Sequence, residues 1–166
     1  MSETRWLSDE EQHVWRSFNA AVSMLRAHLE SQLQHDSGMP QTYYEVLVAL
    51  SEAPEQTLRM SELAEACQSS RSRLSHAVSR LEANGWVHRK SCPTDKRGAL
   101  ASLTPRGFTA LREAAPGHVE AVRSSLFDVL TPDQVAVLGE ISTAIRNGLA
   151  PECELARQAE CEAEQD

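Results

Sequence analysis

The sequence predicts a mainly α-helical fold that carries one small β-hairpin, and three observations lead to this prediction. Apolar residues recur at helical spacing through most of the 166-residue chain. Two strand-like segments, 86–91 and 99–103, flank a charged turn at 95–98. The charge is also segregated, because the whole chain has a net charge of −8, whereas residues 59–97 hold eight Lys/Arg against four Asp/Glu.

Two short helical patterns joined by a tight turn precede the hairpin. The first spans 61–67, and the second follows Ser69 and Ser70, whose hydroxyls suit a helix N-cap. Asn84-Gly85 supplies the left-handed residue that commonly ends a helix. The second helix has a predicted buried stripe of Leu74, Ala77, Val78 and Leu81. Helix, turn, helix and hairpin make a winged helix-turn-helix, in which the second helix enters the major groove of DNA.

The exposed face of that second helix is free of acids, since no carboxylate occurs between Arg71 and Leu81. A solvated helix face normally mixes both signs of charge, so this face favours a polyanion over a protein-binding adaptor role. Arg73 is the best candidate for reading a guanine edge. The candidate DNA-binding residues are Ser70, Arg71, Ser72, Arg73, Ser75, His76 and Arg80 on the helix, and Arg89, Lys90, Asp95, Lys96 and Arg97 on the hairpin.

Several motifs in this region resemble the MarR family of transcriptional regulators. They are Met60 to Ala66, Arg80 to Val87, and Asp95-Lys96-Arg97-Gly98 followed by Leu103-Thr104-Pro105-Arg106-Gly107. The segments Asp95 to Gly98 and Leu103 to Gly107 together match the family's wing signature. The resemblance as a whole covers roughly residues 9–149. It implies that Arg97, at the tip of the wing, enters the minor groove while Asp95 orients its guanidinium. It also implies a homodimer whose terminal helices interlock.

Long amphipathic patterns flank the hairpin region. A capping box from Ser8 to Glu11 predicts a helix that continues to about Gln34. Thr104-Pro105 opens a second one, in which we expect a kink at Pro116-Gly117, and a capping box from Thr131 to Gln134 opens the last. Each has a wide apolar face that needs a partner.

We therefore expect two lobes and a tail. Residues 8–36 and 105–149 form an all-α dimerisation lobe built from the N- and C-terminal helices, and residues 40–104 form the winged lobe. Residues 150–166 form an acidic tail that we expect to be disordered. A two-fold dimer would bind double-stranded DNA at a pseudo-palindromic site.

The family resemblance also implies a repressor that is released by a small effector, most often a phenolic or lipophilic acid bound between the dimer helices and the winged lobe. The candidate ligand-binding residues are Trp15, Met24, His28, Met39, Tyr43, Tyr44 and His118, although most of these also suit a core or a plain surface. The alternative is a switch by oxidation of Cys92 or Cys67, because cations such as Arg89 and Lys90 lower the pKa of a nearby thiol.

The remaining patterns exclude several classes. No apolar run approaches the roughly 18 residues of a membrane span, and the N-terminus has no apolar signal core, so we expect a cytoplasmic protein. The four cysteines show no metal-ligand spacing, so neither a metal nor a disulfide is expected. Serine-hydrolase, phosphate-loop and zinc-protease motifs are missing, so we expect no enzyme and no cofactor.

Overall fold

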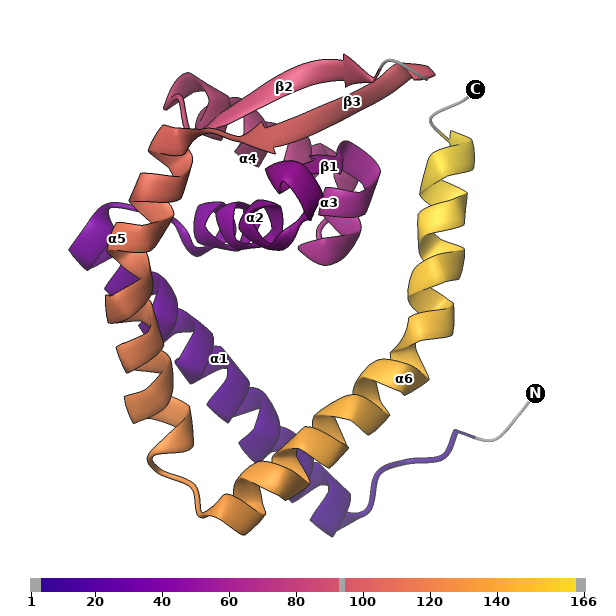
Figure 1. The fold of residues 1–166 in the computed structure, drawn as a ribbon. Helices are drawn as coiled ribbons and strands as arrows, with labels where there is room; N and C mark the ends of the chain where they lie inside the picture. Colours follow the sequence, from indigo (N-terminus) through magenta and orange to yellow (C-terminus); the bar gives the residue numbers. More distant parts are fainter. Residues whose placement is uncertain (1–3, 93–94, 164–166) are drawn as a thin grey trace. The chain divides into compact units, whose positions relative to one another are not determined.

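The fold was obtained as a computed structural model, which describes residues 4–92 and 95–163, without the side chains of 92–98 and 150–163. The chain forms two compact units, of which the first ends at Val122 and the second begins at Arg123. The first unit contains five helices and a small sheet, and the second contains a long helix (Figure 1). The predicted fold class, mainly helical with a small hairpin, is confirmed.

Helix α1 (Asp9–Ser37) begins where the sequence predicts. The backbone amide of Ser8 donates to Glu11 Oε2 at 2.7 Å, and the amide of Glu11 donates to Ser8 Oγ at 3.1 Å. Both bonds satisfy amides that have no partner inside the helix. Gly38 ends the helix in the left-handed conformation with φ 60°, which glycine adopts without steric cost.

The core lies between the short helices and the sheet. The helices are α2 (Gln41–Glu52), α3 (Met60–Ala66) and α4 (Arg71–Ala83), with a 3₁₀ turn at Pro54–Gln56. Each helix contributes leucines or valines that are fully buried: Val46, Leu47, Leu50, Leu63, Leu74, Val78 and Leu81. The predicted stripe of α4 is therefore confirmed, and its burial fixes which face of α4 remains outside.

Three antiparallel strands make the sheet, in the order β1-β3-β2. They are β1 (Thr57–Arg59), β2 (Val87–Cys92) and β3 (Asp95–Leu103). The predicted turn at 95–98 is wrong, because these residues belong to β3 and Asp95 pairs with Cys92. The connection between the two strands therefore falls between Cys92 and Asp95 and not at residues 95–98.

Helix α5 (Pro105–Val122) starts against the end of α4. Thr104 joins them: its amide donates to Trp86 O at 3.0 Å and its hydroxyl donates to Gly85 O at 2.7 Å. The same hydroxyl accepts the amide of Gly107 at 3.0 Å, as an N-cap does. A Cβ on Gly107 would lie 2.1 Å from Trp86 O, so only glycine fits there. The Leu-Thr-x-x-Gly part of the motif thus holds the hairpin, α4 and α5 together.

The second half of α5 packs along α1 within the first unit (Figure 1). A Cβ added at Gly117 would lie 3.1 Å from the Gln32 side chain, which shows how closely the two helices approach. The α-helix continues through Pro116 to Val122. It gives way to a π-helical turn at Arg123–Phe127, where the amide of Asp128 donates to Arg123 O at 2.8 Å.

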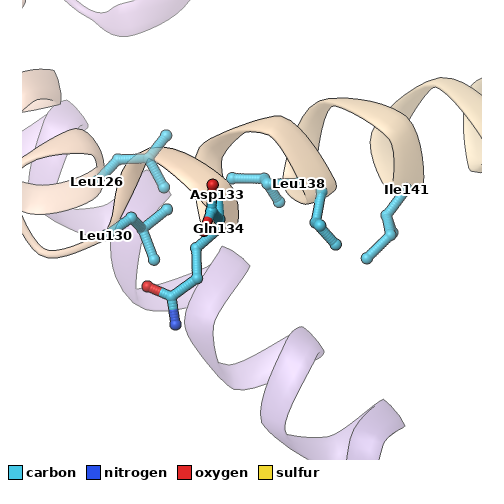
Figure 2. A pocket seen from close by; sticks show the side chains of 7 residues that line it. Leu126, Leu130, Asp133, Gln134, Leu138 and Ile141 are labelled. Carbon is cyan, nitrogen blue, oxygen red and sulfur yellow. The ribbon is translucent and has the colours of Figure 1, made fainter.

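The second unit is dominated by α6 (Pro132–Ala163). The predicted capping box at its start is present, with Thr131 N donating to Gln134 Oε1 at 2.9 Å. An apolar groove lies along its first turns (Figure 2), lined by Leu126, Leu130, Asp133, Gln134, Val137, Leu138 and Ile141. The helix extends into the acidic segment; the predicted disorder of residues 150–166 stays a prediction, because only the backbone of the helical part is described.

Replacing Gly107 with alanine should destabilise the protein. The added methyl meets the Trp86 carbonyl, which cannot move without breaking its bond to Thr104, so we expect the free energy of unfolding to fall by about 1–3 kcal/mol. Gly139→Ala is the matched control, because its Cβ meets nothing within 4 Å in a helix. Urea unfolding compares the two variants. Equal stability of Gly107→Ala and the unaltered protein would contradict this account of the motif.

Candidate nucleic-acid interface

Helix α4 is held at both ends by local bonds. Ser70 Oγ accepts the backbone amide of Arg73 at 3.4 Å, which caps the helix as the sequence predicts. At the other end Gly85 takes φ 72°, and the amide of Trp86 donates to Leu81 O at 2.9 Å. The helix is therefore fixed in length and rotation, and its outer face is well defined.

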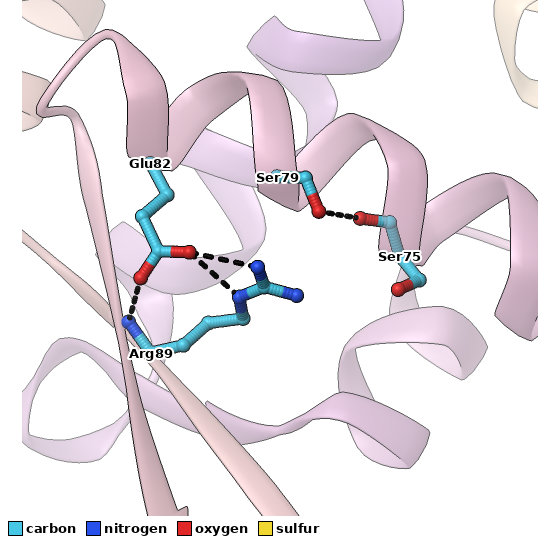
Figure 3. Close-up of polar contacts among 4 residues, drawn as sticks. All are labelled: Ser75, Ser79, Glu82 and Arg89. Carbon is cyan, nitrogen blue, oxygen red and sulfur yellow. Dashed lines mark hydrogen bonds and ion pairs between the residues drawn. The ribbon is translucent and has the colours of Figure 1, made fainter.

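The outer face of α4 carries the predicted residues. All side chains opposite the buried stripe are exposed: Arg71, Ser72, Arg73, Ser75, His76, Ser79 and Arg80. The Ser79 hydroxyl donates to the carbonyl of Ser75 at 2.9 Å, so it is used within the helix (Figure 3). Carboxylates are absent from this face, which leaves a cationic, hydroxyl-rich surface of the kind that contacts phosphates and base edges.

Arg89 on β2 is engaged with α4 rather than free in solvent. Its Nε and Nη2 both lie 2.8 Å from Glu82 Oε2, and its backbone amide donates to Glu82 Oε1 at 3.2 Å (Figure 3). These bonds lower the pKa of the Glu82 carboxyl, first through the Arg89 amide and then through its guanidinium. The pair joins the strand to the helix, so Arg89 positions the hairpin.

The other hairpin residues are placed only in part. Lys90 is exposed on β2 and pairs with Leu100 across the strands. Asp95, Lys96 and Arg97 lie in β3, but their side chains are outside the described residues. The expected orientation of Arg97 by Asp95 therefore stays a prediction.

A cavity of about 840 Å³, open to solvent on one side, is formed by residues of the first unit next to the first turn of α4. Apolar side chains of α2 and β1 form part of its wall, namely Val48, Ala49 and Leu58. The remaining side of the wall is polar and includes Arg26, Glu30, Glu45, Glu52, Cys67, Gln68, Ser69, Arg73 and His118. Mixed walls of this kind hold small organic ligands.

Two of the seven predicted ligand-binding residues meet at this cavity. The rings of Tyr44 and His118 lie 4.4 Å apart at a tilt of 50°, and both residues line the wall. Burial lowers the pKa of His118, against an opposing effect of Glu45. The other five do not line it: Met39 is in the core, Tyr43 packs against the core, and Trp15, Met24 and His28 are exposed on α1.

The structure argues against Cys67 as the site of an oxidation switch. Burial raises the pKa of the Cys67 thiol to about 11, and the nearby charge of Glu45 adds to this effect. Since the thiolate is the reactive form, Cys67 is a poor redox sensor at neutral pH. The side chain of Cys92 is outside the described residues, so the prediction for Cys92 remains open.

Sequence reasoning missed the residues that position the interface and the charged residues of the cavity. Glu82 follows the α4 stripe by one position and reads as an ordinary exposed acid, so only its contact with Arg89 reveals its role. Arg26, Glu30, Glu45 and Glu52 lie on two helices whose relative rotation determines what they face. The glutamates Glu45 and Glu52 are seven residues apart, which was the one available signal that they share a helix face.

No helix within the described residues is both long enough and apolar enough to cross a membrane. Together, the capped α4, the sheet beside it and the hairpin beyond it define a winged helix-turn-helix protein with a cationic outer face.

Comparison with known proteins agrees with this class. The sequence profile of the MarR family matches residues 37–98. The transcriptional repressor MprA of Escherichia coli is 28% identical over 102 residues, covering 57% of this chain and 58% of the repressor's own length. The structure of Sco3205, a MarR family regulator from Streptomyces coelicolor solved in complex with DNA, is 56% identical with a TM-score of 0.85, over 88% of this chain and 92% of that one.

A second Streptomyces coelicolor structure, that of the MarR family regulator AbsC, is 39% identical with a TM-score of 0.78. It covers 93% of this chain and 99% of AbsC. The protein therefore belongs to the MarR family of transcriptional regulators, as the motifs in its sequence indicate.

Neutralising Glu82 should weaken the link between α4 and the hairpin. We expect Glu82→Gln to lower the free energy of unfolding at neutral pH by about 0.5–1 kcal/mol, because the ion pair is partly exposed. In the unaltered protein the pKa of the Glu82 carboxyl is lowered from its ordinary value of 4.5. The carboxylate therefore stabilises the fold at pH values above 4.5, and this stabilisation is lost as the pH falls through the lowered pKa.

Urea unfolding from neutral pH down to values below 4.5 tests the expectation. Glu113→Gln, at an exposed site on α5, is the control. The acid-dependent loss of stability should be smaller in Glu82→Gln than in the control. An identical pH dependence in both variants would show that the Glu82–Arg89 pair does not stabilise the fold.

Proposed function

We propose that this protein is a sequence-specific regulator that binds double-stranded DNA through α4 and the hairpin. The acid-free outer face of α4 carries this proposal, because it faces solvent as a cationic surface on a protein that is acidic overall. The 56% identical Sco3205 was solved in complex with DNA, which supports the same use of this surface here. Arg73 and Arg80 would contact the major groove, and Arg97 the minor groove.

The proposed DNA-binding form is a homodimer. Helix α1 exposes Val14, Trp15 and Phe18, with 56% of Trp15 accessible. Helix α6 separately exposes Val137, Ile141, Ile145 and Leu149, next to its apolar groove. Apolar faces of this extent on two helices favour burial against a second copy. Two-fold symmetry would then place two α4 helices on an inverted pair of half-sites.

The proposed mode of action is repression that a small ligand relieves. The relative MprA of Escherichia coli is a transcriptional repressor, which supports repression as the mode of action. The cavity behind α4 supports relief of repression by a small ligand, because a phenolic or lipophilic molecule bound there would touch the turn before the proposed DNA-reading helix. Switching by oxidation of Cys67 is disfavoured, since its thiol holds its proton at neutral pH, and the oxidation alternative therefore depends on Cys92.

Arginines on the interface should each contribute strongly to DNA binding. We expect Arg73→Ala and Arg97→Ala to weaken duplex binding about tenfold or more at fixed salt. Arg112→Ala, at an exposed position on α5, is the control and should bind normally. Fluorescence anisotropy titration measures all three, and affinity should also fall steeply with added salt. Unchanged affinity in both interface variants would refute the proposed surface.

Charge placed on the apolar face should dissociate the dimer. We expect Phe18→Lys and Ile141→Lys to shift the protein from dimer to monomer in sedimentation analysis, since each buries a lysine in the proposed contact. Ala20→Lys is the control, because two residues correspond to about 200° around a helix and place Ala20 opposite Phe18. A monomeric unaltered protein would rule out the dimer directly.

A further inference from the structure

The exposed face of α4 has a centre and two flanks. The side of the helix that packs into the core is the stripe of Leu74, Ala77, Val78 and Leu81. Successive residues of an α-helix lie about 100° apart around its axis, which gives the direction opposite the middle of this stripe. Four exposed residues lie within about 30° of that direction. We call them the central row; they are Ser72, His76, Ser79 and Ala83.

The arginines of α4 lie beside the central row and not in it. Arg73 and Arg80 are about 20° apart around the helix axis and share one flank. Arg71 lies on the opposite flank, about 20° from Glu82. All three arginine side chains are exposed. Cationic side chains therefore border the central row on both sides.

Contacts in the structure place the two flanks independently of these angles. Glu82 is bonded to Arg89 of β2, so the flank that carries Arg71 lies toward the hairpin (Figure 3). Arg73 lines the cavity to which α2 and the turn before α4 also contribute, so the other flank borders that cavity. The central row therefore points outward between the hairpin flank and the cavity flank.

His76 is the one long side chain in the central row. The other three members are serine or alanine, which allow the helix backbone to approach a partner closely. The Ser79 hydroxyl already donates to the carbonyl of Ser75 at 2.9 Å. Within the part of the chain that the structure describes, the His76 ring has neither a hydrogen bond nor an ion pair. Its N–H is therefore available to a partner.

The dimensions of DNA give the centre and the flanks different contacts. An α-helix with its side chains is about 10–12 Å across, and the major groove is about 12 Å wide. A helix in the groove turns the middle of its outer face to the base edges and its flanks to the phosphate walls. Guanine presents two neighbouring acceptors there, N7 and O6, whereas adenine presents an amino group beside its N7. A ring N–H in the central row therefore favours guanine.

We propose that His76 is the specificity-determining residue of α4: its ring N–H donates to a guanine edge, while Arg73 and Arg80 bind phosphates along one wall of the groove. This inference rests on the proposed function and transfers to His76 the base-reading role that the sequence suggests for Arg73. The two roles have different consequences. A base contact sets the preference at one position, whereas a phosphate contact strengthens binding to all duplexes and adds to its salt dependence.

Base substitutions combined with protein variants separate these roles. In the duplex recovered from a random pool, each guanine of the half-site is replaced in turn by adenine, in both half-sites. The duplexes are titrated with the unaltered protein, His76→Ala, Arg73→Ala and Arg80→Ala. We expect one guanine whose replacement weakens binding by the unaltered protein about fivefold or more. This ratio should fall to about one in His76→Ala and persist in both arginine variants.

The salt dependence of binding gives a second readout. The slope of log affinity against log salt should fall by about one per subunit in each arginine variant and stay unchanged in His76→Ala. Position 76 is exposed and alanine forms helices better than histidine, so His76→Ala should keep the fold, which urea unfolding checks.

Guanine discrimination that persists at every position in His76→Ala would overturn the inference. A half-site in which the unaltered protein discriminates no guanine would do so too. Discrimination that is lost in Arg73→Ala or Arg80→Ala would show that an arginine reads the base, which also contradicts the assignment. All three results leave the proposed function intact. If the unaltered protein binds no duplex, the proposed function itself fails, and the inference fails with it.

Discussion

The attachment of Thr104 and Gly107 to the Gly85-Trp86 carbonyls is the constraint on which the interface depends. Four elements meet there: the end of α4, the two long strands and the start of α5. The Thr104 hydroxyl both caps α5 and donates to Gly85, and Gly107 gives the close approach that both bonds need. These bonds join residues 18 and 19 positions apart in the sequence, so they fix the hairpin relative to α4. The Glu82–Arg89 pair adds a second connection, between α4 and β2.

Apolar and cationic side chains lie on opposite faces of α4. The buried stripe of α4 is apolar, so its cationic residues are confined to the outside. Glu82 is the acid nearest to them along the helix, and it is paired with Arg89 instead of facing outward. The negative charge of the protein lies mainly outside residues 59–97, so the positive potential is concentrated where a polyanion would bind. The cavity behind α4 lies close enough to this face to share one arginine with it.

Local patterns predicted the elements well, and long-range geometry was harder to infer. The α4 stripe, its Ser70 cap and the capping boxes at Ser8 and Thr131 follow from a few neighbouring residues, and the structure confirms them. The hairpin turn was predicted at residues 95–98 because they are charged and end in glycine, whereas these residues belong to β3. The cavity could not be predicted, since its wall combines residues of five helices and β1, whose relative orientations depend on core packing. Of the predicted ligand-binding residues, it contains Tyr44 and His118, while the aromatic Trp15 remains on the surface.

We propose that two α4 helices and hairpins, paired in a homodimer of this acidic protein, read a double helix. Selection of bound duplexes from a random-sequence pool tests it most directly, because the recovered motif reports sequence preference, symmetry and spacing together. We expect enrichment of an inverted repeat whose half-sites are centred about one helical turn, roughly 10 base pairs, apart. Recovery of no enriched motif at low salt, or of a single site without inverted symmetry, would contradict it.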